Sequence, residues 1–285
     1  MRIPEGARKF LRAVLPYGVV RGVQEARERE RKVSRLRAHE EREARILAAS
    51  RPCALAASYQ YETAIEFLEK SGIDREQLLE GSIPEDSLKE VIRLHSELGL
   101  TPARLLHIGN FVGVSLAYLT HHLLRLHSGS FVVSIDPNIP HRGVQRPMDA
   151  CLSLLDHFGL TQNTAIITGF TLEANLGDDG IDYSGNQGTR DIRSNAASCE
   201  NQLPLLGAIC PHAFTSVVID GNHQSDYVRR EIQCIEKLVR PGGIVVFDDV
   251  SEHWENLRAV FAEVTRGSFR EILSDGRIGV AVRVQ

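Results

Sequence analysis

From residue 104 onward, short apolar runs alternate with longer segments in which apolar residues recur at helical spacing. The apolar runs predict strands at 105–108, 131–135, 164–168, 215–219 and 243–247. The segments between them predict helices at 114–126, 148–158, 203–210 and 227–238. This alternation predicts a parallel sheet that is covered by helices on both faces.

The end of the chain departs from this alternation. The runs 269–273 and 278–284 predict two further strands, and Asp275-Gly276 lies between them. Asp-Gly tolerates the positive φ angles of a tight hairpin, so these two strands are expected to be antiparallel. The predicted fold class is therefore α/β: a Rossmann-like, doubly wound, mostly parallel sheet of seven strands that ends in an antiparallel hairpin, with an N-terminal helical extension.

The first hundred residues have a different character. Residues 1–50 form a predicted helical extension, in which 21–45 is dense in Arg and Glu at spacings that support a solvated helix. The extension could lie on a membrane surface or bind a partner, or it could pack on its own domain or on a second subunit in a homo-oligomer. Residues 51–100 form a predicted helical cap region, with amphipathic helices at 73–79 and 87–98, and the sheet domain follows at 101–285.

Composition narrows the class of protein. The chain has 285 residues and a formal net charge of -4, so its charge does not demand a nucleic-acid partner. Its five cysteines lack the C-x-x-C spacing of metal sites, which favours a reduced, cytoplasmic protein. No apolar run approaches the roughly 20 residues that span a bilayer. Charged residues also interrupt the N-terminus, where a signal peptide would be apolar.

The loop after the first predicted strand contains two glycines. Gly109 lets the chain turn sharply out of the strand, and Gly113 allows a close approach at the start of the helix. Asp136 closes the next strand, where an acid can accept hydrogen bonds from ribose hydroxyls. Together they favour a ligand that contains adenosine. Each feature alone could also be structural. The glycines could serve helix packing, and Asp136 could cap the turn at Pro137.

Two later strands end in acidic residues. Because strand ends of a parallel sheet converge on the ligand crevice, four residues are expected at one rim. They are Asp220, His223, Asp248 and Asp249. Three carboxylates and an imidazole could hold a divalent cation and handle a proton, and consecutive Asp residues repel unless something neutralises them. The same acids could instead cap helix starts.

Two histidines are candidates for a catalytic base. His223 lies three residues after Asp220 and is the stronger candidate, because its ordinary pKa is near neutrality. His253 is the competitor, and the neighbouring Trp254 could form an apolar wall against a substrate ring. Either histidine could alternatively have only a surface or capping role.

Residues 105–116 read Leu-Leu-His-Ile-Gly-Asn-Phe-Val-Gly-Val-Ser-Leu, and Ser134-Ile-Asp-Pro follows the next strand. These segments resemble the first two motifs of class I S-adenosylmethionine (SAM)-dependent methyltransferases. Asp220-Gly-Asn-His and Pro241-Gly-Gly-Ile-Val-Val-Phe-Asp-Asp resemble the small-molecule O-methyltransferase branch of that class. This branch includes macrolide sugar O-methyltransferases and cephalosporin-hydroxylase-like proteins. The resemblance covers roughly residues 100–285.

The resemblance implies SAM as the cofactor. The residues that it implies for cofactor binding are His107, Gly109, Asn110, Gly113, Ser115, Asp136 and Asp220. His107 stands where the family usually has an acid, and it could meet the carboxylate of the cofactor. The resemblance also implies that Asp220, Asp248 and Asp249 hold Mg²⁺, which would lower the pKa of an acceptor hydroxyl.

The predicted function is therefore metal-assisted O-methylation of a small-molecule or saccharide acceptor in natural-product or polysaccharide biosynthesis. Three alternatives are weaker. The chain could be a non-methylating family member, such as a hydroxylase-associated component, or a non-catalytic assembly protein that recruits partners through residues 1–50. A nicotinamide dehydrogenase fits poorly, because the glycine loop lacks the G-x-G-x-x-G pattern.

Residues 177–202 form a long polar insert. An irregular segment of this length is usually functional or disordered, so it could be a mobile lid over the acceptor or a disordered insertion. Its acids Asp178, Asp179 and Asp182 do not have the spacing of a calcium-binding loop.

Overall fold

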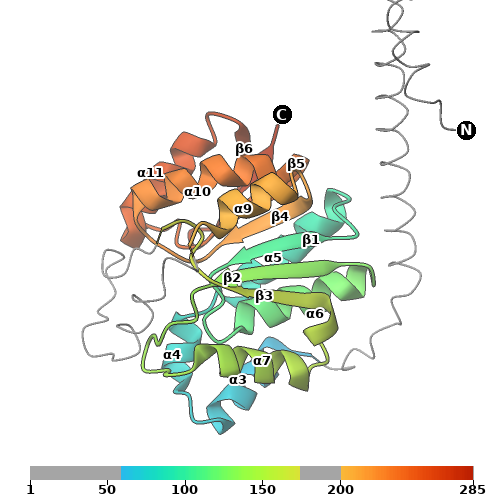
Figure 1. The fold of residues 1–285 in the computed structure, drawn as a ribbon, viewed down its shortest axis with the longest axis vertical. Coiled ribbons are helices and arrows are strands. Elements are labelled where there is room, and N and C mark those ends of the chain that lie inside the picture. Colours follow the sequence, from blue (N-terminus) through green and yellow to red (C-terminus); the bar gives the residue numbers. More distant parts are fainter. Residues whose placement is uncertain (1–58, 174–199, 285) are drawn as a thin grey trace, which may run out of the picture. The chain divides into compact units, whose positions relative to one another are not determined.

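The computed structural model describes residues 59–173 and 200–284 (Figure 1). The predicted N-terminal extension at 1–50 and nearly all of the insert at 177–202 lie outside these residues. Within the two described ranges, none of the helices combines the length and the apolar character that crossing a membrane requires. The three described cysteines, Cys151, Cys210 and Cys234, are free thiols, as the sequence predicts.

Seven strands form one sheet in the order β3-β2-β1-β4-β5-β7-β6. The strands are β1 (Arg104–Ile108), β2 (Phe131–Asp136), β3 (Thr164–Thr168), β4 (Phe214–Ile219), β5 (Val239–Phe247), β6 (Phe269–Ser274) and β7 (Gly279–Arg283). Strands β1 to β5 pair in parallel, whereas β7 pairs antiparallel with both β5 and β6. The predicted fold class, including the antiparallel hairpin at the end, is confirmed.

Helices cover both faces of the sheet (Figure 1). The α-helices are α3 (Tyr61–Lys70), α4 (Arg75–Glu80), α5 (Glu85–Glu97), α6 (Val114–Leu126), α7 (Pro147–His157), α9 (Gln202–Ile209), α10 (Ser225–Leu238) and α11 (Glu255–Val264). Two short 3₁₀ helices are η1 (Thr161–Asn163) and η3 (Glu252–Trp254).

Alternation along the strands divides the core in two. Leu105 and Val218 point into a core that α3 to α7 share, while Leu106 and Val217 point into a second core with α9 to α11. Successive side chains of a strand face opposite sides of the sheet, so each parallel strand needs apolar residues at nearly every position. The described part, 59–100, of the predicted helical cap region at 51–100 belongs to the same hydrophobic core as one face of the sheet.

Local sequence explains where several helices begin. Asp74 caps α4, because its Oδ1 accepts hydrogen bonds from the backbone N–H groups of Glu76 (2.9 Å) and Gln77 (3.3 Å). Helix α5 begins directly after Pro84, and acids fill its first turn, where the helix dipole favours negative charge. Helix α6 begins after Gly113, which has a left-handed φ of 88°.

Two elements differ from the sequence-based expectation. Helix α11 was not assigned, although Leu257, Val260 and Phe261 form its buried face at helical spacing. Strand β5 begins at Val239 rather than at residue 243, because Val239 pairs with Phe214. The register then shifts between Phe214 and Ser216, where the Pro-Gly-Gly segment adds extra residues to β5.

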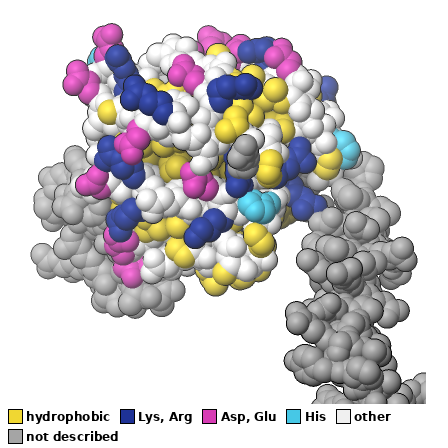
Figure 2. Space-filling view, turned by 90° about the horizontal axis from the view of Figure 1, so that it is seen from above, with side chains coloured by type: hydrophobic (Ala, Val, Ile, Leu, Met, Phe, Trp, Pro, Cys, Tyr) yellow, Lys and Arg dark blue, Asp and Glu magenta, His cyan; other side chains and the backbone are white. Residues whose placement is uncertain are grey.

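The surface carries both signs of charge. Seen from above the view of Figure 1, basic and acidic side chains are interspersed between smaller hydrophobic areas (Figure 2). This mixture agrees with the small formal net charge of -4.

Candidate active site

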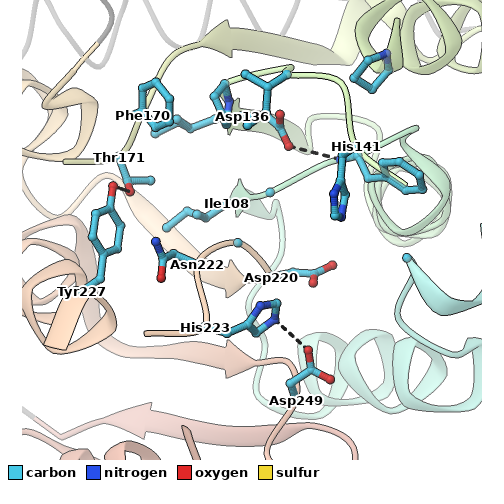
Figure 3. Close-up of a pocket in the computed structure, with 18 of the residues that line it drawn as sticks. Ile108, Asp136, His141, Phe170, Thr171, Asp220, Asn222, His223, Tyr227 and Asp249 are labelled. Atoms are coloured by element: carbon cyan, nitrogen blue, oxygen red, sulfur yellow. Dashed lines mark hydrogen bonds and ion pairs between the residues drawn. The ribbon is translucent and has the colours of Figure 1, made fainter. Parts of the chain in front are cut away.

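A cavity of about 690 Å³ opens at the carboxyl ends of the parallel strands (Figure 3). Gly109 after β1, Asp136 at the end of β2, Asp220 after β4 and Asp249 after β5 all contribute to its lining. The chain adds β2 and β3 on one side of β1 and then adds β4 and β5 on its other side, so the strand order reverses at β1. Such a switch point is where open α/β sheets bind ligands, and the volume lies within the usual range for ligand sites.

The backbone at Gly109 requires a residue without a side chain. Its φ is +80°, and a β-carbon on it would lie 1.8 Å from the carbonyl oxygen of Asp220. The ends of β1 and β4 therefore touch through their backbones, and we call this part of the cavity wall at Gly109 the shelf. The N–H of Gly109 donates to the carbonyl of Ile135 (2.9 Å), which ties this shelf to β2. Gly113 is equally constrained, since a β-carbon there would lie 2.6 Å from Sγ of Cys151.

Asp136 connects the glycine loop to the end of β2. Its Oδ2 accepts from the N–H groups of Asn110 (2.6 Å) and Phe111 (3.2 Å), and its Oδ1 accepts from the N–H of Asn138 (2.5 Å). A carboxylate offers about four lone-pair sites, so Asp136 retains capacity to bind a ligand while it holds the loop. Burial raises the pKa of Asp136, and the three N–H donors oppose that shift.

Four of the predicted cofactor residues do not line the cavity; they are His107, Asn110, Gly113 and Ser115. Asn110 shapes the loop, because its carbonyl accepts from the N–H of Gly113 (2.7 Å). Ser115 accepts a hydrogen bond from the N–H of Ile83 (2.9 Å) and so links α6 to the turn before α5. Of the predicted cofactor residues, Gly109, Asp136 and Asp220 line the cavity.

His107 is fully buried in β1, and burial lowers its pKa to about 4. It alternates with Ile108, which lines the cavity, so its ring faces the opposite side of the sheet. The nearby backbone of Gly109 opposes part of this pKa shift, although neither ring nitrogen makes a hydrogen bond of good geometry within the described residues. A direct contact between His107 and a cofactor therefore remains a prediction from the sequence alone.

His223 and Asp249 form a pair at the acceptor side of the cavity (Figure 3). Nε2 of His223 lies 2.8 Å from Oδ2 of Asp249, and the imidazole stacks on Trp254 with ring centroids 4.6 Å apart. A carboxylate only accepts hydrogen bonds, so Nε2 carries the proton and Nδ1 carries the lone pair. Burial alone would raise the pKa of Asp249, but the bond from His223 and the charge of Arg277 hold it below the ordinary value.

The three predicted metal ligands are engaged differently. Arg277 binds Asp248 through two hydrogen bonds, Nε to Oδ1 (2.9 Å) and Nη2 to Oδ2 (2.6 Å), and its Nη1 lies 2.7 Å from Oδ1 of Asp249. Asp220 lines the cavity, and burial together with repulsion from Asp248 and Asp249 raises its pKa well above the ordinary value. In the part of the chain that the structure describes, no group of three or more His, Cys, Asp or Glu residues is arranged to hold a metal ion.

This arrangement does not fit the predicted Mg²⁺ ion. Both oxygens of Asp248 are bound to Arg277, and the oxygens of Asp249 are divided between Arg277 and His223. Magnesium needs free oxygen ligands at about 2.0–2.1 Å in near-octahedral geometry. The guanidinium therefore holds the oxygens that a cation would require.

His253, the competing candidate base, also lines the cavity, but it is exposed at the rim. Arg277 and a polar group formed by Thr171, Tyr227 and Glu231 also line the cavity and were not predicted from the sequence. Thr171 Oγ1 donates to Glu231 and lies 3.1 Å from the hydroxyl of Tyr227. An acid among the apolar residues of the buried face of α10 was the available signal for Glu231. Its burial raises its pKa to about 8.

Comparisons with known proteins bear on the family and the fold. The model of a family described as a methyltransferase domain matches residues 106–250, just over half of the chain. No curated protein matches the chain significantly.

Several solved structures are similar to this chain. The O-methyltransferase TomG from Streptomyces achromogenes, which is involved in tomaymycin synthesis and was solved with SAM, is 16% identical over 81% of this chain and 92% of its own, with a TM-score of 0.48. The O-methyltransferase from Bacillus cereus, solved with S-adenosylhomocysteine (SAH), is 15% identical over 80% of this chain and 93% of its own, with a TM-score of 0.47. The SAH-bound methyltransferase PaMTH1 from Podospora anserina is 11% identical over 95% and 99%, with a TM-score of 0.50. Identities this low bear on the fold alone.

Proposed function

This chain belongs to the methyltransferase-domain family, and we propose that it transfers a methyl group from SAM to a hydroxyl oxygen of a small-molecule acceptor. The observation that carries this proposal is the position of the His223–Asp249 pair. It lines the same cavity as the Gly109 shelf and Asp136, so a donor site and a base share one space.

The donor side of the cavity has features suited to a nucleoside. The Gly109 shelf lines the cavity beside Asp136, and Asp136 offers an acceptor for ribose hydroxyls. Bound SAM would supply an electrophilic methyl group. The backbone at Gly109 and the carboxylate of Asp136 would position the donor and thereby reduce the entropic part of the barrier.

The acceptor side has features suited to proton transfer. Nδ1 of His223 would take the proton of an acceptor hydroxyl, and Asp249 would stabilise the resulting imidazolium and fix its orientation. Trp254, stacked on the imidazole, provides an apolar surface against which a substrate could pack. No step is assigned to Mg²⁺, because Arg277 and His223 hold the carboxylate oxygens of Asp248 and Asp249.

The class of acceptor is a finer part of the proposal. A sugar or a secondary metabolite remains the expectation from the late sequence motifs. A cytoplasmic location, expected from the cysteines, and homo-oligomers formed through residues 1–50 also remain expectations. The half-exposed Trp254 and the exposed His253 at the rim are compatible with a flat or polyhydroxylated acceptor.

Calorimetry with SAM and SAH, followed by transfer of labelled methyl groups to sugars, phenols and other hydroxylated metabolites, tests the proposal. We expect binding of both nucleosides and label on an acceptor oxygen. The absence of binding at millimolar SAM and SAH would contradict the proposed donor site. Binding without transfer to any hydroxyl would favour a non-methylating family member.

A matched pair of variants tests the role of Asp136. Asp136→Asn is expected to weaken SAH binding about tenfold or more, because hydrogen bonds to charged groups contribute about 1.5–3 kcal/mol. Asp149→Asn, on the half-exposed side chain of Asp149 in α7, should leave the affinity unchanged. Equal affinities for SAH in the two variants would contradict the assignment.

A further inference from the structure

Arg277 contacts both of the acidic residues that follow β5, Asp248 and Asp249. Its guanidinium binds both oxygens of Asp248 and Oδ1 of Asp249, at distances of 2.6–2.9 Å. The side chains of Asp248 and Asp249 are only 2% and 9% exposed, whereas that of Arg277 is 35% exposed. Arg277 therefore reaches from the cavity into a buried acidic pair. It hydrogen-bonds both oxygens of Asp248 and forms an ion pair with Oδ1 of Asp249, an oxygen that accepts no hydrogen bond from the described residues.

The main chain holds Arg277 in place. Oδ1 of Asp275 accepts from the N–H groups of Arg277 (2.8 Å) and Ile278 (2.7 Å), which closes the hairpin turn. Oδ2 of Asp275 accepts from the hydroxyl of Ser87 in α5 (2.8 Å), so the turn is fixed to a helix. The carbonyl of Arg277 accepts from the N–H of Val250 (2.9 Å), directly after the acidic pair. The turn that carries Arg277 is thus hydrogen-bonded to Ser87 on one side and to Val250 on the other.

The contacts of Arg277 continue to the candidate base. Oδ1 of Asp249 binds Arg277, and Oδ2 of the same carboxylate binds Nε2 of His223. A guanidinium has five N–H donors in a rigid planar arrangement, which suits two adjacent carboxylates better than a flexible ammonium does. Arg277 consequently fixes the carboxylate that orients His223.

Resting on the proposed methyl transfer, we propose that Arg277 takes the place of a divalent cation, as the fixed positive charge that offsets part of the negative charge of Asp248 and Asp249 and orients the Asp249–His223 pair. The reaction then needs no metal ion. Arg277 is a positioning residue, since it acts on the acceptor through Asp249 and His223.

Metal binding tests the proposal independently of catalysis. Titration of Mn²⁺ into the SAH-saturated wild-type protein, followed by electron paramagnetic resonance, is expected to show no site in the micromolar range. In Arg277→Ala, bare carboxylates should bind Mn²⁺ at least tenfold more tightly than in the wild type. Arg270→Ala, which removes an exposed arginine of β6, is the control and should match the wild type. A micromolar Mn²⁺ site in the wild type would overturn the proposal.

Activity provides the second measurement. Wild-type turnover should be unchanged after exhaustive chelation of metal ions. A loss of turnover that Mg²⁺ restores would contradict metal independence. The proposed function would still be tested separately by SAH binding. Arg277→Ala should lose at least a hundredfold in kcat with little change in the KM for SAM, and added guanidinium ion should restore part of that loss. A purely structural arginine would instead show parallel losses of SAH affinity and turnover, without rescue by guanidinium.

Discussion

Nε2 of His223 lies 2.8 Å from Oδ2 of Asp249, although 26 positions separate the two residues and they follow different strands. Asp249 has a φ of +58°, a left-handed conformation that is unusual for a residue with a side chain. Strained backbone of this kind often occurs at functional sites, where the surrounding structure enforces it. Here the contacts of Asp249 with His223 and Arg277 provide that constraint.

The first prediction concerns the base. His223→Gln should lower kcat by about 10²–10⁴, the usual contribution of general base catalysis, while SAH affinity remains within about threefold. His253→Gln should lower kcat less than tenfold. Steady-state kinetics with a hydroxylated acceptor and calorimetry with SAH provide the measurements. If His253→Gln lowers kcat more than His223→Gln does, His253 rather than His223 is the catalytic base.

The second prediction concerns the shelf. Gly109→Ala forces a β-carbon to within 1.8 Å of a backbone oxygen and also strains a positive φ, so it should abolish measurable SAH binding. Strain at such a φ alone costs about 1–3 kcal/mol. Gly72→Ala is the matched control, because its φ is +91° and nothing lies within 4 Å of the added carbon. Urea denaturation should show a clearly larger loss of unfolding free energy for Gly109→Ala, and equal losses would refute the steric argument.

The third prediction concerns Glu231. Burial raises its pKa to about 8 in the folded protein, from an ordinary value of 4.5. The folded state therefore holds a proton that the unfolded state releases, and this contribution to stability is present below about pH 4.5 and is lost as the pH rises towards 8. Glu231→Gln should remove this loss, so relative to the wild type it should gain about 1–3 kcal/mol of stability between pH 5 and pH 8.

Urea denaturation of the wild type, Glu231→Gln and Glu236→Gln at pH 5, 6, 7 and 8 measures this difference. Glu236 lies on the same helix but is only partly buried, so its variant should follow the wild type. Parallel stability curves for the wild type and Glu231→Gln would show that Glu231 is ionised in the folded protein.

The fourth prediction concerns His107. Its pKa is lowered to about 4 by burial, whereas an unfolded histidine has a pKa of 6.5. The unfolded state gains a proton as the pH falls from 6.5 to 4, so the wild type loses stability over this range. His107→Leu should remove that loss and leave SAH affinity unchanged, because the ring makes no hydrogen bond of good geometry within the described residues and does not line the cavity.

His95→Leu is the control for His107→Leu. His95 is buried with a similarly lowered pKa, but its Nδ1 donates to the carbonyl of Val91 and its Nε2 accepts from the hydroxyl of Ser216, both at 2.8 Å. Its replacement should therefore destabilise the protein even at pH 7.5, where His107→Leu should not. Thermal denaturation at pH 5 and 7.5 separates the two variants. Loss of SAH binding in His107→Leu would restore the sequence-based assignment of His107 to the cofactor site.

The sequence by itself determined the elements of the fold and the chemistry of the strand ends. Hydrophobic periodicity is local, so it was sufficient to predict the strands and most of the helices from residue 104 onward, and the Asp-Gly turn was sufficient to predict the final hairpin. Gly109, Asp136, Asp220 and His223 could be selected because parallel strands end at a common edge.

Only the tertiary structure decided which partners these residues have. The antiparallel register that pairs Phe247 with Gly279 brings the turn of the last hairpin beside the end of β5, and Arg277 then meets Asp248, 29 positions away. Nothing in the local pattern of either segment specifies that contact, since it depends on strand order and register. For the same reason the sequence could indicate that the adjacent aspartates need neutralisation, but the fold supplies an arginine where the sequence suggested a metal ion.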